Sequence, residues 1–290
     1  MKVKATTKVY AIIGHPVSHS LSPVMHNAAF ESLSLDCVYV AFDIQPRDLE
    51  PAARAIRALG ISGVNVTIPH KESILFFLDE VSQEAALTGA VNTIKNEEGK
   101  LVGYNTDVAG FLRAIEEDLG VNPKGISLVL IGAGGAARAV LSGMCMKGAT
   151  RIYIANRTLD KAKKLASEFK RAFKDVFIEG ISLYDKNGLE EALSKSTLLV
   201  NSTSAGMKGT ASPLIPLELL PKDAVIYDLI YTPRETELVK RAKQLGYRAA
   251  GGLNMLLYQG AESFEIWTGK RAPIEVMREV IEKELSDTTQ

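Results

Sequence analysis

Short runs of β-branched and other apolar residues alternate along the chain with longer stretches in which apolar residues recur every three or four positions. The short runs predict strands at residues 8–14, 37–43, 63–68, 127–132, 151–156, 197–203 and 224–230. The longer stretches predict helices, for example at 158–173 and 235–246. Strands that alternate with helices are typical of βαβ units, so the sequence predicts an α/β fold with mostly parallel sheets.

The alternation is interrupted once. Residues 91–106 are predicted to form two short strands around an Asn-Glu-Glu-Gly turn, and a helical pattern at 107–120 then leads into a new strand. We therefore place a domain boundary near Thr106 and expect two α/β domains with a cleft between them. After residue 251 only helical patterns remain, and periodicity alone leaves open whether this tail closes the second domain or returns to the first.

Composition narrows the class of partner. Lysine plus arginine equals aspartate plus glutamate at 34 each, so no basic field attracts nucleic acid or anionic lipid, and we expect a small-molecule partner.

The first apolar run is too short for a signal peptide and no later run is long enough for a membrane span, so a cytoplasmic protein is expected. Cys37 and Cys145 are expected to remain thiols. Both a monomer and a homodimer fit this composition.

A glycine-rich turn follows the predicted strand at 127–132. Gly132, Gly134 and Gly135 stand between this strand and a helix that is expected to begin near Gly135. Such a turn lets a pyrophosphate approach backbone N–H groups at the positive end of a helix, and Ala137 is a permitted variant of the third glycine in G-x-G-x-x-G. The strand and helix on either side favour a dinucleotide site over a plain tight turn.

The end of the following strand indicates which dinucleotide binds. An NAD site usually carries an acidic residue there for the ribose 2′-hydroxyl, whereas this strand ends at Asn156-Arg157-Thr158. Arginine pairs with phosphate and an acid would repel it, so we expect NADP rather than NAD. Lys161, one helical turn further on, can add a second positive charge. Without the glycine turn upstream, Arg157 would be interpreted as a surface cation.

A lysine and a carboxylate stand at strand ends in the first domain. Lys71 follows a predicted strand and lies beside the polar residues Asn65, Thr67 and His70, while Asp107 follows the last short strand before the boundary. Ligands bind at the carboxyl ends of strands in α/β domains, and a Lys-Asp pair is the minimum for proton transfer with a secondary alcohol. The alternative is a surface lysine and an aspartate that caps its helix.

Three of the four histidines lie close together, at His15, His19 and His26. Two prolines keep them off a common helical face, and no cysteine or carboxylate between residues 9 and 30 completes a metal site, so no metal is expected. The same segment contains Ser20 and Ser22.

Ser22 is expected to cap a helix that begins with Pro23. Neither Ser20 nor Ser22 lies in a G-x-S-x-G nucleophile elbow. Two hydroxyls beside a helix start are well suited to holding a carboxylate.

Eight motifs along the chain resemble those of the shikimate dehydrogenase family. They are G-x-P-V-x-H-S-x-S-P at 14–23, N-V-T-x-P-x-K at 65–71, G-A-V-N-T at 89–93, N-T-D at 105–107, G-A-G-G-A at 132–136, N-R-T at 156–158, N-S-T-S-A-G-M at 201–207 and G-L-N-M-L-x-x-Q at 252–259. The resemblance implies reversible NADPH-dependent reduction of 3-dehydroshikimate to shikimate, on the way to chorismate and the aromatic amino acids. It also implies a substrate-binding domain from residues 1–106 and 252–290, with the final helices packed back on it, and a Rossmann-type NADP-binding domain from residues 107–251.

The resemblance assigns roles to individual residues. Lys71 and Asp107 become the catalytic pair, and the substrate-binding residues are Ser20 and Ser22 for the carboxylate, with Thr67, Lys71, Asn92, Asp107, Tyr231 and Gln259 around the rest of the ring. The cofactor-binding residues are Gly132, Ala133, Gly134, Gly135, Ala136, Asn156, Arg157, Thr158, Lys161, Leu229 and Gly252. Lys161 stands where many relatives carry a second arginine, so a weaker preference for NADP is expected. Leu229 stands where methionine is common, which is a mild change.

Three alternatives compete with this interpretation. A quinate or dual quinate/shikimate dehydrogenase that prefers NAD is disfavoured by the serine pair and by Arg157. A non-catalytic NADP-binding sensor is disfavoured by Lys71 and Asp107. A folate-type dehydrogenase of similar layout would not explain Ser20 and Ser22.

Overall fold

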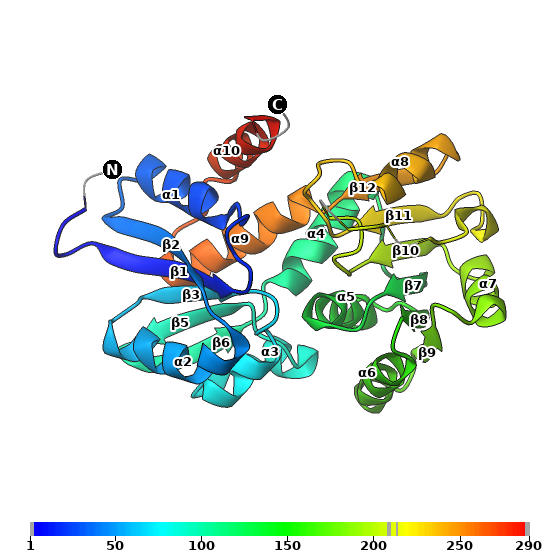
Figure 1. Cartoon of the computed structure of the whole chain (residues 1–290), viewed down its shortest axis with the longest axis horizontal. Helices are drawn as coiled ribbons and strands as arrows, with labels where there is room; N and C mark the ends of the chain where they lie inside the picture. Colours follow the sequence, from blue (N-terminus) through cyan, green and yellow to red (C-terminus); the bar gives the residue numbers. More distant parts are fainter. Residues whose placement is uncertain (1–2, 208–209, 213, 288–290) are drawn as a thin grey trace. The chain divides into compact units, whose positions relative to one another are not determined.

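The computed structural model describes residues 3–207, 210–212 and 214–287, which form two compact units. The first unit comprises Met1–Asp107 and Leu257–Gln290, and the second comprises Val108–Leu256 (Figure 1). The chain from Leu257 onward therefore returns to the first unit, whereas residues 252–256, which the resemblance assigned to that domain, fall in the second. The assignment of substrate to the first unit and cofactor to the second stays a prediction.

The first unit is built around a six-stranded sheet of order β2-β1-β3-β5-β6-β4. Its strands are β1 (Lys8–Gly14), β2 (Cys37–Asp43), β3 (Gly63–Val66), β4 (Glu80–Val81), β5 (Thr93–Glu97) and β6 (Lys100–Tyr104). Strands β2, β1 and β3 run parallel, while β5 pairs antiparallel with both β3 and β6. The two-residue turn between β5 and β6 holds Glu98 and Gly99 at φ 55° and 95°, as a tight hairpin requires.

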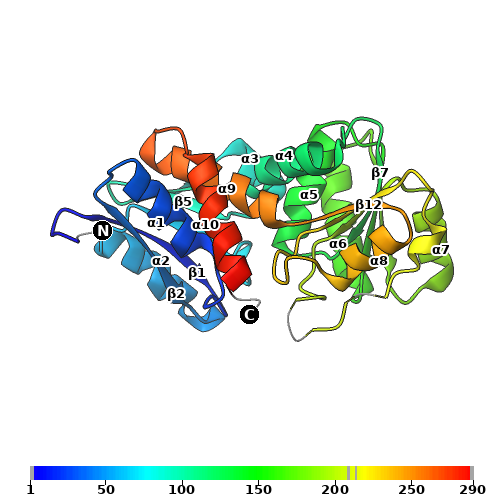
Figure 2. The same ribbon diagram turned by 90° about the horizontal axis from the view of Figure 1, so that it is seen from above.

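Helices cover both faces of this sheet. They are α1 (Ser22–Ser32), α2 (Leu49–Ala58), α3 (Gln83–Thr88), α9 (Leu253–Thr268) and α10 (Ile274–Asp287), with 3₁₀ turns at Pro46–Asp48 and Ser73–Phe77. Alternate residues of β1 face opposite sides. The Tyr10 ring lies 5.1 Å from Phe30 and 5.2 Å from Trp267, beneath α1 and α9, whereas Ile13 packs with α2. Helix α10 packs against α1 (Figure 2).

An asparagine side chain covers part of the outer edge of β2. The Asn27 amide nitrogen donates to the Tyr39 carbonyl at 2.9 Å, and the Tyr39 N–H donates to the Asn27 Oδ1 at 2.8 Å. The amide therefore makes the two hydrogen bonds that a neighbouring strand would otherwise supply. It also fixes the backbone from which the buried Tyr39 side chain extends.

The second unit contains a six-stranded, fully parallel sheet of order β12-β11-β10-β7-β8-β9. The strands are β7 (Ser127–Ile131), β8 (Arg151–Asn156), β9 (Phe177–Ser182), β10 (Leu198–Asn201), β11 (Val225–Asp228) and β12 (Arg248–Gly251). The helices are α4 (Asp107–Leu119), α5 (Gly135–Met146), α6 (Leu159–Ala172), α7 (Lys186–Ser194) and α8 (Glu237–Gln244), with a 3₁₀ turn at Leu217–Leu219. If β7 to β12 are renumbered 1 to 6, the order of the strands from β9 across the sheet to β12 is 3-2-1-4-5-6. This is the strand order of a Rossmann-type fold, so the predicted fold class is confirmed.

The described part of the chain contains no helix that combines the length and the apolar character of a membrane span. Cys37 and Cys145 are both buried free thiols, and burial raises the pKa of the Cys145 thiol to about 12.

Candidate active site

Lys71 and Asp107 form a shielded ion pair in the first unit. Lys71 lies between β3 and the 3₁₀ turn that follows, and Asp107 is the first residue of α4. The Lys71 Nζ lies 2.5 Å from the Asp107 Oδ2, and the two side chains are only 14% and 6% exposed. Little water reaches this contact, so the attraction between the charges is weakly screened. The structure thus brings together the two residues predicted to transfer the proton.

The Asn92 side chain holds the other oxygen of Asp107. The backbone N–H of Thr106 lies 2.7 Å from the Asn92 Oδ1, and because an N–H can only donate, this position must be the amide oxygen. The Asn92 nitrogen therefore points to the Asp107 Oδ1 at 2.9 Å and to the Gln259 Oε1 at 3.2 Å. Three residues predicted to bind substrate, Asn92, Asp107 and Gln259, are thus connected by hydrogen bonds.

Behind these residues lies a group of buried hydroxyls that sequence reasoning missed. The Ser263 hydroxyl donates to the Gln259 carbonyl at 2.9 Å, and its oxygen lies 2.7 Å from the Thr93 hydroxyl. The Asn65 amide nitrogen donates to the same oxygen at 3.1 Å. A sequence signal for Ser263 did exist, because it stands four residues after Gln259 and therefore on the same face of α9.

The two serines lie at the start of α1, but Ser22 is not the cap that the sequence predicted. Helix α1 begins at Ser22, and Leu21 is the residue at the cap position. The Ser20 hydroxyl accepts the Ser22 N–H at 3.2 Å, so the neighbouring serine supplies the acceptor for this N–H. The buried Ser22 hydroxyl faces that of Tyr39, which donates to the Asn65 Oδ1 at 2.7 Å. Through Tyr39 and Asn65, the serine segment is therefore connected with the buried hydroxyls of Thr93 and Ser263.

Gly14 lets the segment of Thr67 lie close to β1. Thr67 follows β3 and is half-buried. A Cβ at Gly14 would collide with the Thr67 Cγ2 and lie 3.1 Å from the Ile68 carbonyl oxygen. The absence of a side chain at Gly14 therefore lets β1 and the segment after β3 approach closely.

The histidines make separate contacts. His26 is fully buried and stacks on Tyr39 with a centroid distance of 4.5 Å, and burial lowers its pKa to about 3. The His15 Nδ1 lies 2.6 Å from the Asp43 Oδ1, whereas the His70 Nε2 lies 2.6 Å from the Ile44 carbonyl oxygen. Within the described ranges, no three histidine, cysteine or acidic side chains gather as a metal site would require.

In the second unit, the glycine turn leads from β7 into α5. Gly132 has φ +110°, and a Cβ there would lie 2.6 Å from the Ser202 Oγ, so both the backbone conformation and the space favour glycine. No neighbouring heavy atom lies within 4 Å of a Cβ built on Gly134. Ala133, Gly135 and Ala136 are partly exposed in the same turn. The open turn at the start of α5 fits a pyrophosphate.

The segment Asn156-Arg157-Thr158 joins β8 to α6. The Asn156 amide nitrogen donates to the Thr158 carbonyl at 2.9 Å, which stabilises the turn. The Arg157 and Lys161 side chains are exposed. Both cations are therefore accessible to a phosphate group.

Leu229 and Gly252 pack directly on one another. A Cβ at Gly252 would collide with the Leu229 carbonyl, and the Gly252 N–H donates to the Ile230 carbonyl at 3.0 Å. Tyr231 lies in the same segment after β11, in the second unit. The other residues predicted to bind substrate lie in the first unit.

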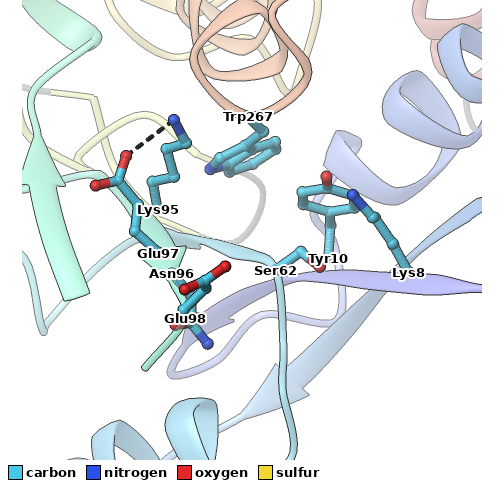
Figure 3. A pocket seen from close by; sticks show the side chains of 8 residues that line it. All are labelled: Lys8, Tyr10, Ser62, Lys95, Asn96, Glu97, Glu98 and Trp267. Carbon is cyan, nitrogen blue, oxygen red and sulfur yellow. Dashed lines mark ion pairs between the residues drawn. The ribbon is translucent and has the colours of Figure 1, made fainter. Parts of the chain in front are cut away.

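The first unit also contains a pocket of about 380 Å³, at the end of its sheet opposite to Lys71 and Asp107 (Figure 3). Lys8 opens β1, and Ser62 precedes β3, so the pocket lies at the amino ends of these strands. Its Lys95 pairs with Glu97 at 2.9 Å. None of the predicted site residues lines it.

Comparisons with known proteins agree along the chain. Residues 12–94 match the family model of the shikimate dehydrogenase substrate binding domain, residues 116–208 match that of shikimate/quinate 5-dehydrogenase, and residues 252–282 match that of the shikimate 5′-dehydrogenase C-terminal domain. The shikimate dehydrogenase (NADP(+)) of Methanopyrus kandleri is 47% identical over 283 residues, which are 97% of each chain.

Solved structures give the same result. A crystal structure of shikimate dehydrogenase in complex with NADP+ has a TM-score of 0.89 and 44% identity, over 98% of each chain. The shikimate 5-dehydrogenase of Listeria monocytogenes, in complex with shikimate and NAD, has a TM-score of 0.88 and 34% identity, over 97% of this chain and 98% of that one. The chain therefore belongs to the shikimate dehydrogenase family.

Proposed function

We propose that this chain catalyses the reversible NADP-dependent interconversion of 3-dehydroshikimate and shikimate, a step of chorismate and aromatic amino acid biosynthesis. The observation that carries the proposal is the shielded pair of Lys71 and Asp107, whose second carboxylate oxygen is held by Asn92. The balanced charge supports small molecules rather than nucleic acid as partners. We also propose the cytoplasm as the compartment. A homodimer is compatible with this function.

The glycine turn and the cations after β8 fit NADP. The turn is open at Gly134, where a Cβ would meet no neighbouring heavy atom within 4 Å, and the exposed Arg157 and Lys161 supply charge for the 2′-phosphate. We assign Leu229 and Gly252 to the nicotinamide end of the cofactor on the family resemblance. When bound, NADPH supplies the hydride that reduces the carbonyl carbon.

Lys71 transfers the proton of the reaction, and Asp107 orients Lys71. In reduction, the Lys71 Nζ donates a proton to the carbonyl oxygen as it becomes an alcohol, and in oxidation the same nitrogen accepts it back. Asp107 holds the Lys71 nitrogen in place. Asn92 keeps Asp107 from turning away, because its amide nitrogen donates to the second oxygen. We assign Gln259 and Thr67 to the substrate hydroxyls.

A spectrophotometric panel of shikimate and quinate against NADP and NAD tests this function. We expect the highest kcat/KM for shikimate with NADP. Faster turnover of quinate with NAD would replace the proposal with a quinate dehydrogenase. Tight NADP binding without any turnover would instead indicate a sensor.

The serine segment provides a test of substrate binding. We expect Ser20→Ala and Ser22→Ala to raise the KM for shikimate by roughly tenfold to a hundredfold, the effect of losing a hydrogen bond to a charged group, with a smaller change in kcat. Ser18→Ala is the matched control, because Ser18 is exposed in the same segment. A chelator is expected to leave the rate unchanged. Normal KM values in both variants would contradict the carboxylate role.

A further inference from the structure

Asp228 ends β11 in the second unit with its carboxylate fully buried. Its Oδ1 accepts from the Asn201 amide nitrogen at 2.9 Å and from the Ile230 N–H at 3.2 Å. Its Oδ2 accepts from the Thr236 hydroxyl at 2.7 Å. These donors come from the end of β10, from the segment after β11 and from the residue that caps α8. One carboxylate therefore joins three separate segments.

Each of these segments leads to a residue of the proposed cofactor site. Leu229 follows Asp228 directly, and its backbone packs against Gly252. Ser202 follows Asn201, and its Oγ is the atom that a Cβ on Gly132 would meet. The contacts of Asp228 thus reach both the glycine turn and the Leu229–Gly252 contact.

The donor set around Asp228 is fixed. The Thr203 N–H donates to the Asn201 Oδ1 at 3.1 Å, so the Asn201 amide must turn its nitrogen toward Asp228. The Thr236 hydroxyl oxygen accepts the Val239 N–H at the start of α8, which leaves its hydrogen for Asp228. Three donors converge on Asp228, and of these the Ile230 N–H and the Asn201 amide nitrogen can only donate.

Among the residues that the structure describes, none of opposite charge pairs with the Asp228 carboxylate to offset its burial. Burial raises the pKa of this carboxyl from 3.8 to about 6, against the opposing effect of its three hydrogen bonds, and no charged group contributes. The charged side chains of α8, namely Glu237, Lys240, Arg241 and Lys243, are at least partly exposed, as is Arg248 of β12. A buried ionised carboxylate without a cation lowers folding stability. Residues that are costly to stability are often retained for function.

We propose that Asp228 is a positioning residue for the cofactor, which holds the segment bearing Leu229 against Gly252 at a cost in folding stability. This inference rests on the proposed NADP-dependent function. It assigns to Asp228 no contact with substrate or cofactor. Its two carboxylate oxygens accept three hydrogen bonds. An asparagine amide has only one oxygen and therefore cannot accept all three in the same way.

The test is Asp228→Asn, with the Kd for NADP+ measured by titration calorimetry at pH 8 and the Tm measured at pH 5 and pH 8. We expect the Kd to rise about tenfold, the effect of about one lost hydrogen bond in a buried site.

The stability measurement tests the cost of the buried charge. The pKa of Asp228 is higher in the folded state than in the unfolded state, so the wild-type protein loses folding stability as the pH rises toward 6 and Asp228 ionises. The variant has no such loss, so its Tm relative to wild type is expected to increase from pH 5 to pH 8.

Asp223→Asn is the control, because Asp223 is exposed near the amino end of β11, and it should change neither quantity. Thr236→Val removes one donor and leaves the carboxylate, so it should also raise the Kd. A merely structural role for Asp228 predicts a lower Tm for Asp228→Asn at both pH values. Wild-type affinity for NADP+ in Asp228→Asn would overturn this inference alone, whereas a wild-type chain that binds no NADP+ would overturn the proposed function as well.

Discussion

Lys71→Ala is expected to lower kcat by about 10²- to 10⁴-fold with little change in the KM for shikimate, as loss of a general acid/base predicts. Lys71 is the group placed to move the proton, since its Nζ contacts Asp107 in a site that is largely closed to water. Steady-state kinetics in both directions provide the measurement. Because the variant leaves a buried carboxylate without its cation, its folding should be checked by circular dichroism.

Lys95→Ala is the matched control for Lys71. Lys95 also lies in the first unit and also pairs with a carboxylate, that of Glu97, but it lines the pocket at the amino ends of the strands. We expect its kcat to stay within about twofold of wild type, because exposed ion pairs contribute little. A folded Lys71→Ala variant with near-normal kcat would remove Lys71 from the mechanism.

Arg157→Ala is expected to weaken NADP+ binding by about 10- to 100-fold and NAD+ binding by much less. The guanidinium offers a planar set of donors to the 2′-phosphate, and NAD+ lacks that phosphate. Titration of both cofactors against wild type and variant gives the ratio directly. Lys161→Ala should lower the same ratio less, because an ammonium binds phosphate as a point charge.

Arg171→Ala is the control for Arg157. Arg171 is an exposed arginine in the last turn of α6, whereas Arg157 precedes the first turn. It should leave both affinities unchanged. Equal losses of NADP+ and NAD+ affinity in Arg157→Ala would show that this arginine does not read the 2′-phosphate.

Sequence reasoning predicted the α/β class because strong apolar runs such as those of β1, β7 and β8 are bounded by clear turn residues. It missed three strands. β12 consists of Arg-Ala-Ala-Gly, without a β-branched residue, and β4 has only two residues. β9 carries the strand formers Phe177, Ile178 and Ile181, but Gly180, where a Cβ would lie 2.5 Å from the Ala162 carbonyl carbon in α6, interrupts the apolar run.

The candidate site was predictable where its residues follow strands. Lys71 and Asp107 stand after β3 and β6, and a sequence pattern can locate the carboxyl ends of strands. The contact between Ser263 and Thr93 joins residues 170 positions apart, and it depends on the rotation and height of α9 against the sheet. No local pattern specifies those quantities, so the buried hydroxyls behind Asn92 required the structure.

The Asn27 contact with β2 has a consequence for self-association. An uncovered edge strand offers its N–H and C=O groups to any extended chain that approaches, which makes it a starting point for intermolecular sheet growth and aggregation. At Tyr39 both outward groups are already bonded to Asn27. A second chain that added a strand here would have to expel the amide and break two hydrogen bonds before it formed its own. The Asn27 amide therefore makes the addition of a strand at this point of β2 less favourable.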